Sequence, residues 1–300
     1  MIARRSIGFL LHPGEEVPVQ AAIARAHACG FTTWTALDDP EAAMAEHGAS
    51  TALLVTLGGD GTFLYGARLA APRGIPVVGV NRGRLGFLND VEIGALPEAI
   101  SRFAAGDYTT QQRSLLETTV GDAAERVLAV NEIVVRARDV NVVRLRVEVA
   151  GDLLGEFDAD GVVVATATGS TAYALSAGGP PVDPRVHAVV VVPLAPHAVI
   201  SRPVVIPERL EVNVSVERGH VFVAADGRSV AWLADGGSVL VGPGPDLEVI
   251  RFVDSPSFQS RLRQKFRYGI PHKDLLLEPF DDAGPRTGHA TPPGGIDGPS

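Results

Sequence analysis

Apolar residues in the first third of the chain gather in strand-length runs that alternate with helical stretches. The runs that predict strands are 5–11, 31–37, 52–57 and 75–80. The stretches that predict helices are 17–29, 40–47, 63–70 and 96–105. Alternating strands and helices favour right-handed crossovers and a mainly parallel sheet. Residues 1–106 are therefore predicted to form an α/β domain.

The pattern changes after Tyr108, where the apolar runs become short, rich in β-branched residues and separated by turn residues. These runs are 115–120, 127–135, 143–149, 162–165, 189–194, 210–216, 221–225, 230–233 and 247–252. Pairs such as Gly151-Asp152 and Asp226-Gly227 lie between them, as expected of hairpin turns. Residues 107–254 are predicted to form an all-β domain, an antiparallel sandwich or barrel with one helical insertion at about 170–177.

The end of the chain has a different composition again. Residues 255–280 include a cationic stretch from Arg261 to Tyr268 with an apolar stripe at helical spacing, which predicts a helix whose charges face solvent. We expect this segment to return to the N-terminal domain. Residues 281–300 are mostly Gly, Pro, Asp and Thr, which predicts a disordered tail.

Composition narrows the functional classes. The chain has a net charge of -9 and 46% apolar residues. This charge argues against a general nucleic-acid binder, although it leaves room for a local basic pocket. Cys29 is the single cysteine, so neither an internal disulfide nor a cysteine metal cluster is expected. No apolar run is long enough for a membrane span, and a cytoplasmic location is the simplest expectation.

The most informative stretch is Gly58-Gly59-Asp60-Gly61-Thr62, between a buried strand and a helix. Glycines at the end of a parallel strand let backbone N–H groups approach an anion. Asp60 would repel a phosphate there unless it takes part in the chemistry. We therefore predict a phosphoryl-transfer site with Asp60 as the acid/base group; the alternative is an ordinary tight turn. A Walker A lysine and the Gly-x-Gly-x-x-Gly spacing are both missing, so this is neither a P-loop nor a dinucleotide fingerprint.

Two further stretches carry unusual polar residues. Asn131 and Glu132 interrupt an apolar strand pattern, which is costly unless they bind something, such as sugar hydroxyls, or meet water at a strand edge or bulge. A strand after Asp160 ends in a Thr-Gly-Ser-Thr turn that opens a short helix. Ser170 or Thr171 is predicted to cap that helix, and Tyr173 could stack on a base or belong to the core.

Two other stretches with polar residues are more consistent with a structural role than with ligand binding. His197 and Arg202 lie in a proline-bounded segment, where a role in the turn is favoured over phosphate contact. Asp226-Gly227, taken by itself, predicts a plain hairpin turn. No two histidines have the helical spacing of a zinc site, and the metal ligands are left unassigned.

Taken together, these motifs resemble the NAD kinase family. They occur along the chain in the family's order, which is 58–62, 81–88, Asn131-Glu132, 160–173, Pro196-His197 with Arg202-Pro203, and Asp226-Gly227. Diacylglycerol and sphingosine kinases share the glycine turn, whereas the Asn-Glu pair and the Thr-Gly-Ser-Thr-Ala-Tyr block are more specific. The resemblance implies an α/β domain, an all-β domain and a site between them. It also implies NAD as acceptor, ATP or polyphosphate as donor, and a divalent metal, Mg²⁺ or Mn²⁺.

The resemblance also implies roles for individual residues. Asp60 would be the general base, or would hold the metal, and the sequence leaves these two roles open. Gly61 would contact NAD, and Asn131 with Glu132 would hold the dinucleotide. Asp160 would contact the nicotinamide half, while the adenine side would be lined by Thr171, Ala172, Tyr173 and Ser176. Gly58, Gly59, Gly61 and Thr62 would form the phosphate-binding loop. Family members are usually homodimers or homotetramers in which a neighbouring subunit helps to build the site.

Three positions depart from the family pattern. Ala167 replaces the usual proline, Arg228 stands where glutamine is common, and Asp158 stands where a basic residue is frequent. Asp158 is therefore given no phosphate role. Two other functions stay open at this stage. One is a lipid or sphingoid-base kinase that shares the glycine turn, and the other is a dinucleotide-binding regulator without catalysis.

Overall fold

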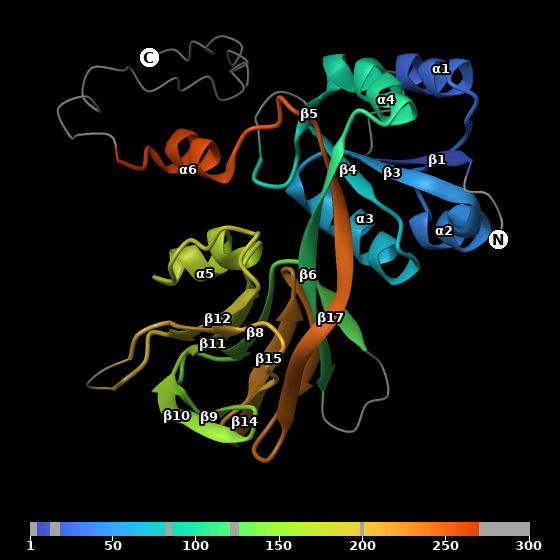
Figure 1. Cartoon of the computed structure of the whole chain (residues 1–300). Coiled ribbons are helices and arrows are strands. Elements are labelled where there is room, and N and C mark those ends of the chain that lie inside the picture. The colour runs from blue at the N-terminus through green and yellow to red at the C-terminus, as the bar shows by residue number, and fades with distance from the viewer. Residues whose placement is uncertain (1–4, 13–18, 82–85, 121–125, 199–200, 270–300) are drawn as a thin grey trace, which may run out of the picture. The chain divides into compact units, whose positions relative to one another are not determined.

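The computed structural model describes residues 5–12, 19–81, 86–120, 126–198 and 201–269. Its N-terminal part alternates strands and helices as predicted (Figure 1). The elements are β1 (Ser6–Leu11), α1 (Gln20–Ala28), β2 (Thr32–Ala36), α2 (Pro40–His47), β3 (Thr51–Leu57), α3 (Asp60–Ala70), β4 (Val77–Asn81), β5 (Val91–Glu92) and α4 (Leu96–Ala105).

The following part consists of strands with one short helix. The elements are β6 (Thr109–Val120), β7 (Val127–Ala129), β8 (Glu132–Ala137), β9 (Val143–Val149), β10 (Asp152–Ala159), β11 (Gly161–Thr166), α5 (Tyr173–Ser176), β12 (Ala188–Leu194), β13 (Val204–Pro207), β14 (Val212–Arg218), β15 (Val221–Ala225), β16 (Arg228–Leu233) and β17 (Ser238–Arg251). The predicted fold class, an α/β domain followed by an antiparallel β domain, is confirmed.

The strands of the N-terminal part pair in parallel. β1 lies between β2 and β3, and β4 pairs with β3 and β5. Helices α1 and α4 pack on one face of this sheet, where Ala22, Ala26 and Ile100 join Phe9 and Val55 in one buried cluster. Helices α2 and α3 bury Met44 and Phe63 in the cluster of the other face. The carboxyl ends of β3 and β4 thus meet at one edge, where ligands bind in such sheets.

The two parts share one sheet through β6 and β17, which pair antiparallel along most of their length. The first half of β17 pairs with β14 of the β part, and Val249 near its end pairs with Val77 of β4. The predicted strands 115–120 and 247–252 are therefore only sections of two longer strands. Their polar, solvent-facing residues hide the remaining length from a search for apolar runs.

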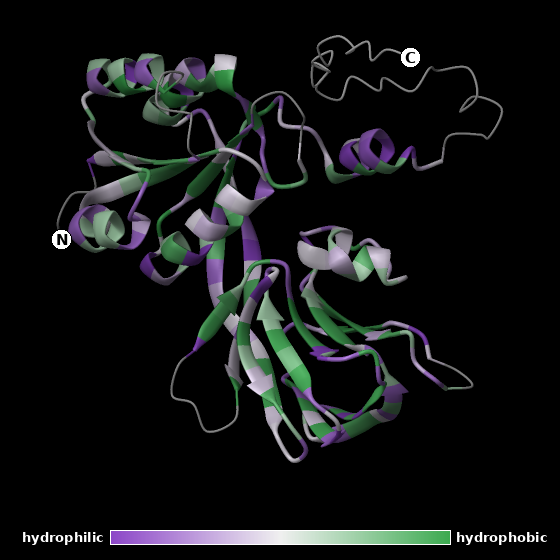
Figure 2. Cartoon of the chain, turned by 180° about the vertical axis from the view of Figure 1, so that it is seen from behind, coloured by the Kyte–Doolittle hydropathy of each residue, from purple (hydrophilic) through white to green (hydrophobic). Residues whose placement is uncertain are grey.

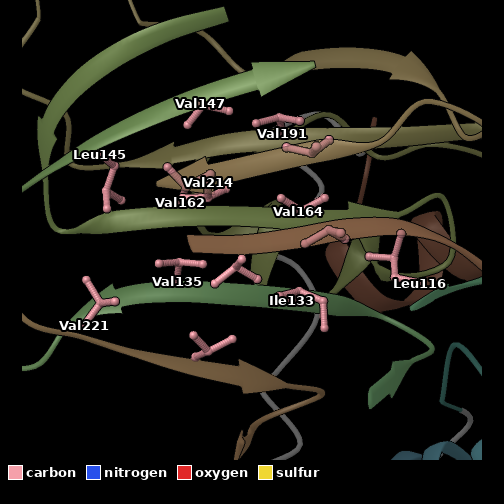
Figure 3. Close-up of a cluster of buried hydrophobic side chains, with 14 of the residues drawn as sticks. Leu116, Ile133, Val135, Leu145, Val147, Val162, Val164, Val191, Val214 and Val221 are labelled. Carbon is pink, nitrogen blue, oxygen red and sulfur yellow. The ribbon is translucent and has the colours of Figure 1, made fainter. Parts of the chain in front are cut away.

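In the β part this shared sheet faces a second sheet with the order β13-β12-β11-β8-β15-β16. Side chains of both sheets interdigitate between them, among them Val135, Val147, Val162 and Val214 (Figure 3). Figure 2 shows the same strands as bands of hydrophobic residues alternating with hydrophilic ones. On its outer face the second sheet is covered by the segment of α5, which contributes Ala174 to a separate buried cluster.

Two predicted elements differ from the structure, and two strands of the β part were not predicted. The run 127–135 is two strands, because the chain leaves the shared sheet after β7 and enters the second sheet at β8. The helix expected at 170–177 is a 3-10 turn, Gly169–Thr171, followed by the single-turn helix α5. Strands β10 and β13 were not predicted, because Gly155, Glu156 and Asp158 interrupt the apolar residues of β10, and β13 has only four residues.

The C-terminal helix α6 (Phe258–Phe266) confirms the predicted helix, and Figure 2 shows it mostly in hydrophilic colours. The prediction that its charges face solvent was wrong for Arg261, which is only 3% exposed, whereas Arg263 and Lys265 are exposed. Residues 1–258 form one compact unit, and those from 259 onward belong to a second. The domain limits at 106 and 254 and the return of segment 255–280 stay predictions. The tail 281–300 lies outside the described residues. No described helix combines the length and apolar character needed to cross a bilayer.

Candidate active site

The glycine turn lies between β3 and α3, as predicted. Gly58 has a φ of +154°, and a Cβ there would stand 2.4 Å from the Thr62 hydroxyl oxygen, so the turn requires glycine. A Cβ at Gly59 or Gly61 would meet nothing within 4 Å. Gly59 is extended and α3 begins at Asp60. The backbone N–H groups of the first helical turn are thus approachable by an anion.

Asp60 is exposed at the start of α3 and is contacted by Asn89, which follows the loop after β4. Asn89 Nδ2 donates to Asp60 Oδ1 over 3.4 Å and to the Gly58 carbonyl over 3.3 Å. Asn89 itself is buried, with 2% exposed. A single buried amide therefore orients both the glycine turn and its carboxylate.

Gly86 provides the space that the Asp60 carboxylate occupies. A Cβ on Gly86 would stand 2.1 Å from Asp60 Oδ1. Gly86 is the last glycine of the predicted 81–88 motif, whose residues 82–85 lie outside the described part of the chain. Because Gly86 has no side chain, this motif leaves room for the carboxylate of Asp60, the candidate catalytic group.

Gly86→Ala is expected to displace the Asp60 carboxylate and lower kcat by about tenfold, since small misplacements of reacting groups are costly. Steady-state turnover of the purified protein, in the phosphoryl transfer expected from its sequence, measures this effect. Gly94→Ala is the matched control, because a Cβ on Gly94 meets nothing within 4 Å. Equal kcat values for the two variants would show that Gly86 does not shape the site.

Asn131 lies where the chain crosses from one sheet to the other, between β7 and β8, and Glu132 is the first residue of β8. Thr166 holds this crossover by donating its N–H to the Asn131 carbonyl over 2.9 Å and its hydroxyl to the Val130 carbonyl over 2.7 Å. Asn131 is half-buried and Glu132 is buried. The crossover thus carries an amide and a carboxylate on consecutive residues of a backbone that Thr166 holds by two hydrogen bonds.

Glu132 is the unusual carboxylate of the site. It is only 6% exposed, and its Oε2 has no hydrogen-bond partner among the described residues. Burial, reinforced by the negative charge of Asp226, raises the pKa of Glu132 to about 7, although the Tyr173 backbone N–H donates to its carboxylate. A buried carboxylate with a spare oxygen is suited to accept a hydrogen bond from a ligand hydroxyl.

The Thr-Gly-Ser turn packs directly on the crossover. A Cβ at Gly169 would stand 2.0 Å from the Asn131 carbonyl oxygen, so only glycine fits there. The predicted N-cap was wrong, because α5 has no side-chain cap. Ser170 Oγ accepts from the Val182 N–H over 2.8 Å and donates its one proton to the Ala167 carbonyl over 2.6 Å. The reason is that Ser170 is fully buried and serves tertiary contacts.

The predicted adenine-side residues follow this turn along the chain. Thr171, Ala172 and Tyr173 are half-buried, and Ser176 is exposed. Thr171 Oγ1 donates to the Thr168 carbonyl over 3.3 Å. Since Tyr173 also contacts Glu132 through its backbone, these residues and the Asn131-Glu132 pair belong to one local group.

A buried cation that sequence inspection missed lies beside the same turn. Arg113 of β6 is 4% exposed, and its Nη1 donates to Thr168 Oγ1 over 3.4 Å. Burial, then the neighbouring charge of Arg251, lowers the pKa of Arg113 to about 10. The guanidinium stays protonated at neutral pH and adds positive potential next to the turn.

Asp160 lies apart from this group. In the pairing of β11 with β8, Gly161 faces Arg136 whereas Ala165 faces Glu132. At about 3.3 Å per residue, the step from Asp160 to Ala165 spans about 16 Å. Asp160 instead lines a cavity of about 720 Å³ with Arg136, Arg138 and Phe222.

Asp226 was predicted to belong to a plain hairpin turn, and the turn between β15 and β16 is confirmed. Its carboxylate, however, points inward and has no exposed surface. It accepts from the backbone N–H groups of Val130, Asn131 and Glu132 over 3.0, 2.7 and 3.4 Å. It also accepts from Arg68 Nη1 of α3 over 2.6 Å. The Asp226 side chain therefore joins α3 to the crossover.

Comparison with known protein families matches both parts of the chain. The family described as ATP-NAD kinase N-terminal domain matches residues 2–108, and the ATP-NAD kinase C-terminal domain matches residues 130–251. The chain belongs to the NAD kinase family. The family and the kinase activity expected from the sequence are thereby confirmed, and nothing favours a lipid kinase or a regulator without catalysis.

Individual relatives agree with this membership. An NAD kinase of Heliobacterium modesticaldum is 43% identical over 72% of this chain and 79% of its own length. One of Methylibium petroleiphilum is 36% identical over 87% of both chains. Two crystal structures have a similar fold. The yeast NADH kinase complexed with NADH has a TM-score of 0.78 at 22% identity, over 90% of this chain and 89% of that one. The NAD kinase from Archaeoglobus fulgidus in complex with ATP has a TM-score of 0.68 at 25% identity, over 87% and 97%.

Proposed function

We propose that this NAD kinase transfers the terminal phosphoryl group of ATP to the 2′-hydroxyl of the adenosine ribose of NAD, with Asp60 acting on that hydroxyl. The carrying observation is the Arg68–Asp226 contact. It ties the helix that begins with Asp60 to the crossover that presents Asn131 and Glu132. A carboxylate on the phosphate side and a polar pair on the sugar side are thus held in one framework.

Asn131 and Glu132 are proposed to bind the ribose hydroxyls of NAD. The free Oε2 of buried Glu132 is an acceptor for a hydroxyl proton, and the Asn131 amide can donate and accept. Thr171, Ala172, Tyr173 and Ser176 would form the adenine-side wall. This assignment is supported by two contacts of their segment with the crossover. The Tyr173 backbone N–H donates to Glu132, and Gly169 packs against the Asn131 carbonyl.

The loop of Gly58, Gly59, Gly61 and Thr62 is proposed to bind the donor phosphates. Its open surface at Gly59 and Gly61 lets phosphate oxygens reach the N–H groups at the start of α3. The Archaeoglobus fulgidus relative was crystallised with ATP, which supports ATP as the donor. Polyphosphate offers the same terminal phosphoryl group and is the second candidate.

The proposed chemistry needs little more than positioning and one proton acceptor. As the ribose oxygen bonds to the γ-phosphorus, the bond from that phosphorus to the β,γ-bridging oxygen breaks and ADP leaves. The ribose hydroxyl proton passes to the Asp60 carboxylate. General base catalysis of this kind contributes about 10²–10⁴-fold. Positioning and charge neutralisation by the loop N–H groups supply the rest.

A divalent cation, Mg²⁺ or Mn²⁺, is proposed as part of the donor complex. The described residues contain no group of three or more His, Cys, Asp or Glu side chains that could cage a metal. Mg²⁺ commonly uses one or two carboxylates, several waters and the substrate phosphates, and exposed Asp60 fits that pattern. Such an ion would neutralise the phosphate charge.

Removal of divalent cations with EDTA is expected to abolish NADP formation, and excess Mg²⁺ or Mn²⁺ should restore it. The melting temperature of the protein without nucleotide should not change, since no protein cage for a metal is present in the described part of the chain. Full activity in EDTA would exclude the cation. A large drop in melting temperature would indicate a structural metal instead.

One assay tests the proposed function directly. Purified protein is incubated with NAD or NADH, Mg²⁺ or Mn²⁺, and ATP or polyphosphate, and NADP or NADPH is measured with an NADP-specific enzyme. A parallel reaction offers a sphingoid base or diacylglycerol as acceptor. Formation of NADP supports the proposal, whereas phosphorylation of the lipid alone, or NAD binding without NADP formation, contradicts it.

A homodimer or homotetramer is proposed as the active form. Asp160 lies about 16 Å along β11 from the Glu132 end, which is far for a residue expected to contact the same dinucleotide. A neighbouring copy that contributes its Asp160 would resolve this separation. Sedimentation of the purified chain measures the oligomeric state. A cytoplasmic location is likewise proposed, from the family resemblance alone.

A further inference from the structure

The interior of the molecule contains one ion pair that reaches two candidate site segments at once. It joins Arg68, in the last turn of α3, to Asp226, in the turn between β15 and β16. The Arg68 side chain is 10% exposed and that of Asp226 is not exposed at all. An ion pair this deeply buried is retained only with excellent geometry and further hydrogen bonds.

The Asp226 carboxylate has those further hydrogen bonds. Its Oδ1 accepts from Asn131 N and Glu132 N, and its Oδ2 accepts from Val130 N and Arg68 Nη1. The Asp226 N–H in turn donates to the Glu132 carbonyl over 3.0 Å. Three successive backbone N–H groups at the crossover are thus satisfied by one side chain rather than by a neighbouring strand.

The backbone of Asp226 shows that this arrangement is built into the hairpin. Asp226 has a φ of +46° and Gly227 a φ of +76°, the left-handed pair of a type I′ turn. Aspartate and asparagine tolerate this region better than other side-chain-bearing residues. The turn thereby aims the carboxylate into the protein, whereas an Asp-Gly turn ordinarily leaves it in water.

We propose that Asp226 is a positioning residue: through Arg68 it fixes the Asn131-Glu132 crossover relative to α3, and so sets where the ribose hydroxyl lies relative to Asp60. Asp226 touches neither substrate in this scheme and acts through the backbone of the crossover. The inference rests on the proposed roles of Asp60, Asn131 and Glu132. It assigns the Asp226-Gly227 motif a task in catalysis.

Asp226→Asn and Arg68→Gln test the inference in the full-length protein. Asparagine keeps the turn conformation and one acceptor oxygen, but its amide nitrogen would face the donors of Val130 and Arg68. Each variant is expected to lower kcat by about 10–100-fold, because misplacement by about 1 Å can cost about 10². The KM for NAD should change by less than about threefold, since the Asn131 and Glu132 side chains remain.

A double variant and a charge-retaining variant separate positioning from general destabilisation. Asp226→Asn combined with Arg68→Gln should lose no more kcat than either single change, within about threefold, because both break the same contact. Arg68→Lys should stay within about fivefold of the wild type. These measurements are made below the melting temperature of every variant.

Asp235→Asn is the matched control. Asp235 also precedes a glycine in a hairpin turn and accepts a backbone N–H, that of Gly219, over 2.6 Å, and Gly219 is not one of the candidate site residues. It should keep wild-type kcat. If Asp226→Asn does not fold, Arg68→Gln and Arg68→Lys decide the question.

Two results would overturn the inference. One is wild-type kcat in folded Asp226→Asn or Arg68→Gln, even with a lowered melting temperature. The other is a double variant whose loss of kcat equals the product of the losses in the two single variants, as expected of two independent sites. A wild-type protein that forms no NADP would instead contradict the proposed function, and this inference with it.

Discussion

Asp60→Asn is expected to lower kcat for NADP formation by about 10²–10⁴-fold, the contribution typical of a general base. The amide matches the carboxylate in shape but cannot take the ribose hydroxyl proton. The fold should be unaffected, since Asp60 is exposed and Asn89 can still donate to the remaining carbonyl oxygen of residue 60. Melting temperature and circular dichroism should therefore match those of the wild type.

Asp152→Asn serves as the control for this change. Asp152 is an exposed carboxylate at the start of β10, and its replacement should leave kcat unchanged. Near-normal turnover in folded Asp60→Asn would remove the base assignment. A Mg²⁺ titration of the variant separates the two roles of Asp60: recovery of kcat at high Mg²⁺ indicates that it holds the metal, and an unchanged loss indicates that it takes the proton.

Glu132→Gln is expected to change how stability depends on pH. Burial raises the pKa of Glu132 from its ordinary value of 4.5 to about 7 in the folded protein, so between these values the folded state holds a proton that the unfolded state has lost. The free energy of unfolding therefore falls as pH rises from about 4.5 to about 7. The full loss is about 3 kcal/mol, at about 1.4 kcal/mol per pKa unit.

Glutamine resembles the protonated glutamate and does not titrate. Compared with its effect at pH 5, Glu132→Gln should therefore stabilise the protein at pH 8 by up to about 3 kcal/mol. Urea unfolding at the two pH values without nucleotide measures this difference. In the same variant, affinity for NAD should fall about tenfold or more, because a charged hydrogen-bond acceptor is lost.

Glu217→Gln is the control, since Glu217 is exposed on β14 and should show no pH-dependent difference. An equal effect of Glu132→Gln at pH 5 and pH 8 would mean that Glu132 titrates normally and that its burial does not matter. Unchanged NAD affinity would remove it from the acceptor site.

Local chemistry made much of this protein predictable. The strand–glycine turn–helix around Asp60 follows from residues adjacent in the chain, and α2 and α4 have the predicted bounds. Their helical patterns and caps are short-range signals, since Asp39 caps α2 and Gly106 ends α4 in the left-handed region. The order of the motifs along the chain was also sufficient to identify the family, because a contiguous motif can be read from the sequence without knowing how the chain packs.

Predictions failed where a residue's neighbours come from elsewhere in the chain. Ser170 resembles a helix cap, yet Val182 satisfies it. The run 127–135 resembles one strand, yet it belongs to two sheets. Asp226 resembles a turn residue, yet its carboxylate bonds to residues 130–132 and to Arg68. In each case the deciding hydrogen bond spans a sequence separation that no local pattern records.

By itself the sequence determined the α/β and β composition, the glycine turn with Asp60 and the kinase family, because these depend on local periodicity and on contiguous motifs. Tertiary structure alone decided that Glu132 is buried with a raised pKa, that Gly86 makes room for Asp60, and that Asp160 precedes the end of β11 remote from Glu132. It also decided that Arg68 and Asp226 join α3 to the backbone of residues 130–132. The physical reason is that burial, electrostatic field and steric fit are properties of surroundings that only folding brings together.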